Sequence, residues 1–350
     1  MEQKKGFHKS VIQFIVSFII TGLIINLVLF SYFKRPPKIN VQAATDKIWG
    51  KESVIIDRTE GFGTVRTDAN GYNNTFIPSE VDNYILLMGS SHTQAINVNQ
   101  NENYAYLLMK KLQDAGINKY VYNVGFDANN FNIVIEHFAA AMQQFPDAEA
   151  VIFEVSDLSF TPQMLLDALS RQISYDPKVG QGKLPIHIDI LNFIQAMPLP
   201  RLIYSRFEYF QPNIKKAFIA KTPQPAAPVE VDSVVYQDAI NKVMETFRQE
   251  AGDKPVLLLY NSTVALNSSG GPVAKPWQIQ VKALAKACAD NNIFFHDMTD
   301  SYVRMLKEDK VAPFGFANAE AGLGHLNKYG HKAIADDLFK IMTEEKWGNK

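Results

Sequence analysis

Short apolar segments alternate with amphipathic segments over most of this 350-residue chain, and this alternation constrains the fold more than any other feature. Each apolar segment is nearly continuous in Ile, Leu, Val and Phe, which is typical of strands covered on both faces of a sheet. The pattern predicts strands over residues 84–88, 120–124, 150–155, 255–260 and 293–296.

Helical patterns occupy the intervals between these strands. Segment 131–144, for example, places Phe131, Val134 and Phe138 on one face. Strand–helix–strand units of about 30 residues predict an α/β fold with a doubly wound, flavodoxin-like parallel sheet. In such a sheet, ligands bind at the carboxyl ends of the strands. Further helices are expected over residues 102–115, 276–290 and 328–343.

An uncharged stretch covers residues 11–33. At a helical rise of 1.5 Å per residue it is about 34 Å long, enough to cross a hydrocarbon core of about 30 Å. Tyr32 and Phe33 suit the headgroup region. We therefore expect a cytoplasmic tail over residues 1–10, a single membrane anchor over 11–33 and an extracytoplasmic body. The alternative is a signal peptide that is cleaved near residues 41–43.

The remaining organisation follows from turn signals and breaks in the pattern. Residues 34–82 are interpreted as a linker and lead-in, and residues 83–345 as the α/β domain. Within that domain, residues 158–231 break the strand–helix rhythm and are interpreted as an insertion, including a helix near 191–196. The insertion is expected to form a covering subdomain, a substrate wall or a docking surface for a membrane partner.

Charge and cysteine content exclude several classes of function. The formal charge is −1, and because residues 1–38 carry +5, the rest of the chain carries −6. An acidic body does not favour nucleic-acid binding, which needs clustered basic surface. The single cysteine, Cys288, excludes an internal disulfide framework. Metal-ligand spacings and a phosphate-binding glycine loop are absent from the sequence, so we expect no metal and no cofactor.

Two short blocks carry residues suited to nucleophilic catalysis. Ser91 follows the first predicted strand in a Gly-Ser-Ser turn, and His325 precedes the C-terminal helix. A serine hydroxyl becomes a useful nucleophile when a nearby imidazole accepts its proton. Ser91 and His325 are therefore candidates for a nucleophile and its base. The alternative is that Ser90 and Ser91 only form a polar turn or a helix cap.

The order and spacing of these blocks resemble the SGNH (GDSL-like) hydrolase family. In that family the first block is Gly-Asp-Ser and the last is Asp-x-x-His. The resemblance implies that Ser91 is the nucleophile and His325 the base. It also implies that Gly125 and Ala128, in the block after the second strand, support the oxyanion. Ser156 stands where the third block of the family has an asparagine that donates to the oxyanion.

The last block departs from the family because Gly322 occupies the position of the aspartate that orients the histidine. We expect a backbone carbonyl, Glu320, Asp297 or Asp300 to orient His325 instead. A Ser-His dyad is the simpler alternative. His331, six residues further on, is interpreted as structural.

Membrane-tethered members of this family include D-alanyl transfer proteins and alginate O-acetylation proteins, which act beside a polytopic membrane O-acyltransferase. The resemblance therefore implies an extracytoplasmic serine esterase or O-acyltransferase that modifies a cell-envelope polysaccharide through an acyl-Ser91 intermediate. One alternative is a catalytically silent accessory protein that binds a glycan or the membrane O-acyltransferase. A lipid esterase is a third reading.

Overall fold

A computed structural model provides the three-dimensional description of the chain. It describes residues 2–127, 130–179, 197–200, 203, 233–266, 271–274, 278–319, 322–344 and 347.

The centre of the fold is a five-stranded parallel sheet with strand order β12-β9-β8-β6-β7. In chain order this is 2-1-3-4-5, the flavodoxin-like arrangement. The direction of the strand order reverses at β6, so β6 and β8 flank the topological switch point. The predicted doubly wound fold class is therefore confirmed. The strands are β6 (Tyr84–Met88), β7 (Tyr120–Asn123), β8 (Ala150–Val155), β9 (Val256–Tyr260) and β12 (Phe294–Asp297).

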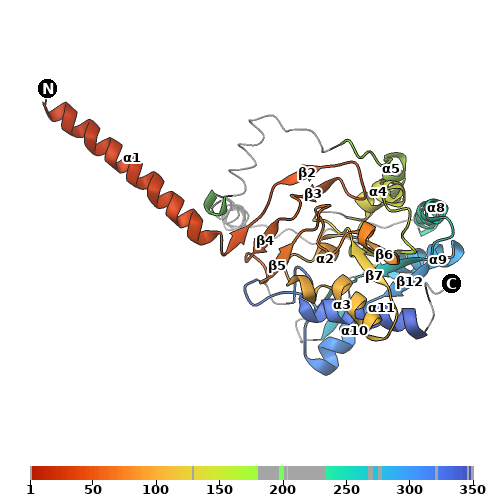
Figure 1. The fold of residues 1–350 in the computed structure, drawn as a ribbon. Helices are drawn as coiled ribbons and strands as arrows, with labels where there is room; N and C mark the ends of the chain where they lie inside the picture. Colours follow the sequence, from red (N-terminus) through yellow and green to blue (C-terminus); the bar gives the residue numbers. More distant parts are fainter. Residues whose placement is uncertain are drawn as a thin grey trace. The chain divides into compact units, whose positions relative to one another are not determined.

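Helices cover both faces of the sheet, as Figure 1 shows. On one face, Leu86, Phe153 and Leu258 pack against α4, α5, α8 and α9. On the other, Ile85 and Leu257 pack against α3, α10 and α11. Because adjacent residues of a strand face opposite sides, both sides of each central strand are apolar. The helices are α3 (Tyr104–Asp114), α4 (Phe131–Gln144), α5 (Pro162–Ser170), α8 (Ser233–Ala251), α9 (Gln278–Asp290), α10 (Thr299–Arg304) and α11 (Lys328–Glu344).

Most element boundaries agree with the sequence patterns to within two residues, which is the usual uncertainty of helix and strand ends. The chain also contains short elements that the patterns did not predict. Among them are the helix α2 (Ser91–Gln94), the 3-10 turns η1 (Pro78–Glu80) and η2 (Gln100–Glu102), the π-helical turn η3 (Met305–Asp309) and the hairpin of β10 (Val264–Leu266) and β11 (Pro272–Ala274). The helices α5, α8 and α10 were not predicted either.

Among the described residues, the N-terminal segment 2–37 groups with residues 197–200 and 203 in one compact unit. Helix α1 (Glu2–Leu29) contains a 20-residue segment, Ser10–Leu29, with a mean hydropathy of 2.4. At 1.5 Å per residue this segment is about 30 Å long, so it is long and apolar enough to cross a membrane. The helix ends four residues before the predicted end at Phe33, which lies in the short strand β1 (Phe33–Lys34).

Residues 38–82, interpreted from the sequence as linker and lead-in, belong to the compact unit that contains the central sheet. They form two antiparallel hairpins. The apolar side chains of these hairpins form a small cluster with Ile96 and Phe126. This lead-in is therefore folded onto the α/β body. Its strands are β2 (Lys38–Asn40), β3 (Lys47–Trp49), β4 (Val54–Asp57) and β5 (Thr64–Arg66).

Part of the predicted insertion, residues 158–231, can be placed. Leu158, Phe160 and Leu165 are buried in the core beside α4 and α8, so the segment begins as an integral part of one face. The predicted helix over 191–196 lies outside the described residues. The role of the insertion stays a prediction.

Stacked aromatic rings hold α4 and α8 against the sheet, and this packing gives a test of the fold. The Phe247 ring lies 4.1 Å from the Phe138 ring and 4.9 Å from the Phe153 ring, and Phe247 is fully buried. Replacing Phe247 with alanine should therefore lower the free energy of unfolding by about 3–5 kcal/mol. Urea unfolding followed by circular dichroism measures this change. The matched control is the exposed Glu250→Ala on the same helix, expected to change it by less than about 0.5 kcal/mol. Equal effects of the two substitutions would contradict the packing described here.

Candidate functional site

Ser91 lies at the carboxyl end of β6, as the first residue of helix α2. Ser90 is the N-cap residue of that helix, and its hydroxyl accepts a hydrogen bond from the His92 N–H. The turn requires glycine at position 89, because a Cβ atom there would lie only 2.1 Å from Thr93 Oγ1. The strand and the turn together place Ser91 at the topological switch point of the sheet, where ligands bind in this class of fold.

A buried carboxylate, that of Glu154 on β8, supports the Ser91 turn. Its Oε2 accepts hydrogen bonds from the Ser90 N–H at 2.9 Å, the Ser90 hydroxyl at 2.7 Å and the Thr93 hydroxyl at 3.1 Å. Its Oε1 accepts from Asn261 Nδ2 at 3.1 Å. Glu154 is only 1% exposed, and these donors offset the cost of burying a carboxylate. The sequence analysis gave Glu154 no role, although an acidic residue inside an apolar strand is a signal of this kind.

His325 reaches the Ser91 turn from the loop before α11. Its Nε2 atom lies 3.0 Å from Ser91 Oγ, across a sequence separation of 234 residues. The predicted nucleophile and the predicted base are thus within hydrogen-bonding distance. The backbone of the His325 loop is held by a hydrogen bond from the Gly315 N–H to the His325 carbonyl at 3.0 Å, and Asn327 donates to the carbonyls of Ala312 and Gly315.

The group that orients His325 is Glu60, from the loop between β4 and β5 of the lead-in. Glu60 Oε2 lies 2.6 Å from His325 Nδ1, and Glu60 Oε1 accepts the His325 backbone N–H at 2.7 Å. Because a carboxylate only accepts, the proton of the neutral ring lies on Nδ1. The Nε2 lone pair then accepts the hydroxyl proton of Ser91. Ser91, His325 and Glu60 therefore form a continuous hydrogen-bonded chain of the kind found in catalytic triads.

Two asparagines hold the Glu60 loop in place. Asn97 Nδ2 donates to the Glu60 carbonyl at 2.8 Å, and the Asn97 carbonyl accepts from the Phe62 N–H. On the other side, Asn318 Oδ1 accepts the Gly61 N–H at 2.9 Å. The loop that carries the acid is thus tied both to the segment after α2 and to the segment before His325.

A glycine permits the close approach of Glu60 to the His325 backbone. Gly324 has a φ of +84°, a conformation that favours glycine, and a Cβ atom there would lie 2.3 Å from Glu60 Oε1. Any larger residue at position 324 would push the carboxylate away from the His325 N–H. The glycine beside the histidine is therefore required by the position of the acid.

The pKa of Glu60 is set by opposing effects. Burial raises it, but the hydrogen bonds from the His325 ring and backbone, with electrostatic interactions from His325 and His92, lower it below the ordinary value of 4.5. A carboxylate whose pKa is lower in the folded state stabilises the fold above its ordinary pKa. This contribution is lost as the pH falls through the lowered, folded-state value. Glu60 is thus held ionised beside the imidazole at neutral pH.

For Asp297 and Asp300, the prediction of the orienting acid from the sequence was wrong. Asp297, at the end of β12, accepts hydrogen bonds from the N–H and hydroxyl of Thr299, and Asp300 lies in α10. Neither is a hydrogen-bond partner of His325, whose Nδ1 is engaged by Glu60. Glu320 lies outside the described residues. In the sequence, Glu60 is recognisable only as part of a glycine-containing turn. No motif around it indicates contact with His325, which lies 265 positions further along the chain.

The residues expected to bind the oxyanion do not all have the positions that the family resemblance implies. The Gly125 N–H donates to Asn123 Oδ1 at 2.8 Å, so it is not free to bind an oxyanion, and this expectation is corrected. Gly125 instead allows close packing, because a Cβ atom there would lie 2.5 Å from Thr93 Cβ. Ala128 lies outside the described residues. Ser156 lines the same cavity as Ser91.

A cavity of about 140 Å³ opens beside Ser91 at the carboxyl ends of β6 and β8. Its position matches the switch point of the sheet. Polar residues outnumber apolar ones in its lining, and they bring hydroxyl, amide and carboxylate groups close to the nucleophile. The lining residues are Ser90, Ser91, His92, Asn130, Phe131, Glu154, Val155, Ser156 and Asp157.

Two further histidines lie near the site without joining the hydrogen-bonded chain. His92 Nδ1 accepts the Leu326 N–H at 3.2 Å, so it fastens the His325 loop to α2. His331 is buried and stacked on Tyr104, with ring centres 5.7 Å apart. Burial, followed by the charges of His92 and His325, lowers the pKa of His331 to about 3, so this ring is neutral at physiological pH. It is a structural residue of the core.

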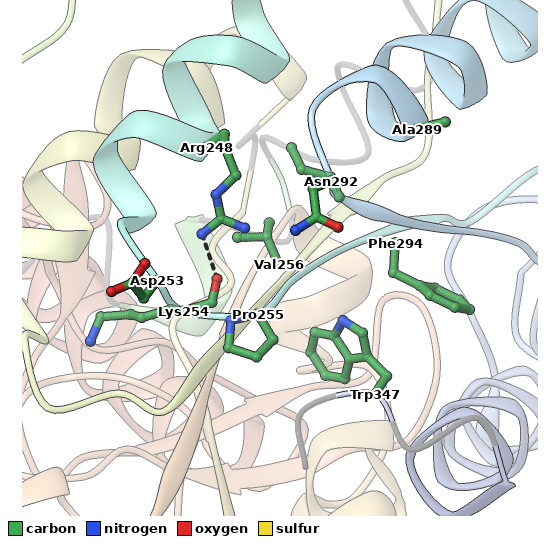
Figure 2. A pocket seen from close by; sticks show the side chains of 10 residues that line it. Arg248, Asp253, Lys254, Pro255, Val256, Ala289, Asn292, Phe294 and Trp347 are labelled. Atoms are coloured by element: carbon green, nitrogen blue, oxygen red, sulfur yellow. Dashed lines mark hydrogen bonds between the residues drawn. The ribbon is translucent and has the colours of Figure 1, made fainter. Parts of the chain in front are cut away.

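A larger cavity of about 300 Å³ lies at the opposite, amino-terminal ends of β9 and β12, far from the Ser91 turn along the sheet (Figure 2). Arg248 lines this cavity, and its guanidinium donates hydrogen bonds to the carbonyls of Gly252 and Lys254. Burial lowers the pKa of this guanidinium. Trp347 and Pro255 form apolar walls. Because nucleophile, base and acid are elsewhere, this cavity is not the catalytic candidate.

Comparison with known proteins gives only structural likenesses, since no family model and no curated protein matches the chain. A lipase/acylhydrolase from Enterococcus faecalis is similar in structure, with 10% identity and a TM-score of 0.41 over 75% of this chain and 96% of the other. A putative GDSL-like lipase from Parabacteroides merdae has 11% identity and a TM-score of 0.41 over 75% and 96%. A catalytic mutant of an acetylxylan esterase from Geobacillus stearothermophilus has 12% identity and a TM-score of 0.40, over 74% of this chain and 94% of the other.

Proposed function

We propose that this protein is a serine esterase or O-acyltransferase that forms an acyl-Ser91 intermediate. The observation that supports this most directly is the hydrogen-bonded chain from Ser91 Oγ through His325 to Glu60, with distances of 3.0 and 2.6 Å. A serine that only caps a helix needs no ionised carboxylate behind a neighbouring imidazole. These hydrogen bonds therefore favour a catalytic role over that of a silent accessory protein.

The geometry supports a two-step acyl transfer. Ser91 Oγ attacks the carbonyl carbon of an ester while His325 Nε2 takes the hydroxyl proton, and Glu60 stabilises the resulting imidazolium. The tetrahedral intermediate collapses when the C–O bond to the leaving alcohol breaks, and Nε2 returns its proton to that alcohol. An acceptor, either water or a sugar hydroxyl, then gives its proton to Nε2 and attacks the acyl carbon of acyl-Ser91. The bond between Ser91 Oγ and the acyl carbon breaks, and Nε2 returns the proton to Ser91 Oγ.

The size and polarity of the cavity favour a short acyl group. At about 140 Å³ it is smaller than the 300–1,000 Å³ typical of sites for drug-sized ligands. An acetyl-sized group fits this space, whereas a long acyl chain would need a larger apolar channel. This supports esters of a polar acceptor such as a glycan over lipid esters.

Location and partner follow from the N-terminal segment and the resemblance. The 20-residue apolar segment of α1 supports a single-pass anchor that holds the catalytic body at the outer face of the cell membrane. A polysaccharide of the cell envelope would then be the acceptor or donor. A polytopic membrane O-acyltransferase is the partner that the resemblance implies.

Covalent labelling tests the nucleophile. A fluorophosphonate probe reacts with activated serines, so we expect it to label the wild-type protein at Ser91, as read by peptide mass spectrometry. Ser91→Ala should abolish the label, and His325→Ala should slow it by about 10²- to 10⁴-fold because the general base is lost. Ser170→Ala, which removes an exposed hydroxyl at the end of α5, serves as the comparison and should keep the label at Ser91. A wild-type protein that stays unlabelled under native conditions would favour the silent accessory role.

The role of Glu60 is tested by an amide of the same shape. Glu60→Gln should lower kcat for p-nitrophenyl acetate by about 10²- to 10⁴-fold with little change in KM, because the ionised partner of the imidazolium is removed. Glu80→Gln, an exposed substitution in the same lead-in, should retain wild-type kcat. If Glu60→Gln keeps full activity, His325 acts without an orienting acid and the dyad reading replaces the triad.

A further inference from the structure

The reaction proposed above needs donors for the negative oxygen of the tetrahedral intermediate. One is the Ser91 N–H, which has no hydrogen-bond partner among the described residues because it opens helix α2. The Gly125 N–H is occupied by Asn123, as shown above. A second donor must therefore come from another wall of the cavity.

Asn130 stands in that wall. It lines the cavity that contains Ser91, and it is the N-cap residue of α4 with an extended backbone. Its side-chain Oδ1 accepts the Ile133 N–H at 3.2 Å. Because an N–H donor requires the oxygen of the amide, this cap fixes which end of the side chain faces the helix. The Nδ2 group is then directed away from the helix.

The Nδ2 group of Asn130 is free to bind substrate. Within the part of the chain that the structure describes, it donates to no other group. Helix α4 has 14 residues, so its positive end, at Asn130 and Phe131, adds a favourable potential for a developing anion in the same cavity. Asn130 and Phe131, at this helix end, line the same cavity as Ser91.

We propose that Asn130 is a catalytic residue whose Nδ2–H hydrogen bonds the oxyanion, a role that rests on the acyl-Ser91 reaction proposed above. When Ser91 Oγ bonds to the carbonyl carbon, the π electron pair moves to the carbonyl oxygen, and Nδ2–H and the Ser91 N–H stabilise that charge. When the pair returns and the leaving alcohol departs, both hydrogen bonds weaken. The helix cap keeps the amide oriented throughout, so no reorganisation is needed during the reaction.

Two substitutions separate this role from helix capping. Asp and Ser cap helices about as well as Asn, so Asn130→Asp and Asn130→Ser should leave the melting temperature within about 2 °C of wild type. Both remove the amide donor, and kcat for p-nitrophenyl acetate should fall by about 10²- to 10³-fold with KM nearly unchanged. Asn130→Asp should be the slower of the two, because its carboxylate repels the oxyanion. Wild-type kcat in both variants would overturn the proposal.

Controls keep the two proposals distinguishable. Gln143→Glu places a carboxylate on the same helix at an exposed position near its other end, where the side-chain oxygen that accepts the Tyr175 N–H is retained, and it should keep wild-type kcat. If Ser91→Ala abolishes turnover while the Asn130 variants retain it, only the role of Asn130 fails. If Ser91→Ala turns over the ester as fast as wild type, or if wild type has no turnover, the proposed function fails and the role of Asn130 fails with it.

Discussion

The hydrogen bond between the Glu60 carboxylate and His325 is the contact on which the candidate site depends. It joins the lead-in hairpin at one end of the body to the loop before the last helix. The carboxylate binds both the ring and the backbone N–H of the same histidine, so it fixes ring orientation and loop position together. Gly324 makes the approach possible, and Asn97 and Asn318 hold the acid loop. The lead-in, residues 38–82, therefore contributes a residue to the candidate site.

The rest of the site is built on the switch point of the sheet. Strand β6 presents Ser91, and β8 supplies the buried Glu154 that binds the turn before it. Rigid, buried strands on both sides leave the nucleophile little freedom, which favours a preorganised site. Asn130, at the start of α4, completes the cavity from the neighbouring connection. Ser91 and Asn130 thus come from different connections at the carboxyl ends of the strands, and Glu154 comes from a strand between them and β9.

The alternating strands and helices of the α/β domain could be predicted from the sequence. Continuous apolar strands such as 84–88 are buried on both faces, so the parallel sheet and the position of Ser91 followed from periodicity. The pairing of Ser91 with His325 followed from the two motif blocks. Glu60 could not be found in this way, because its contact depends on how a hairpin packs in three dimensions. The occupied N–H of Gly125 likewise depends on a side-chain hydrogen bond that no motif encodes.

The tautomer of His325 tests the central claim most directly. If Glu60 orients the ring, the neutral imidazole carries its proton on Nδ1 and leaves Nε2 free to accept from Ser91. Nitrogen-15 NMR of histidine-labelled protein distinguishes the two ring nitrogens, and His325→Gln identifies the signal. The account predicts the Nδ1–H tautomer in the wild-type protein and its loss in Glu60→Ala. A wild-type ring protonated on Nε2 would contradict it.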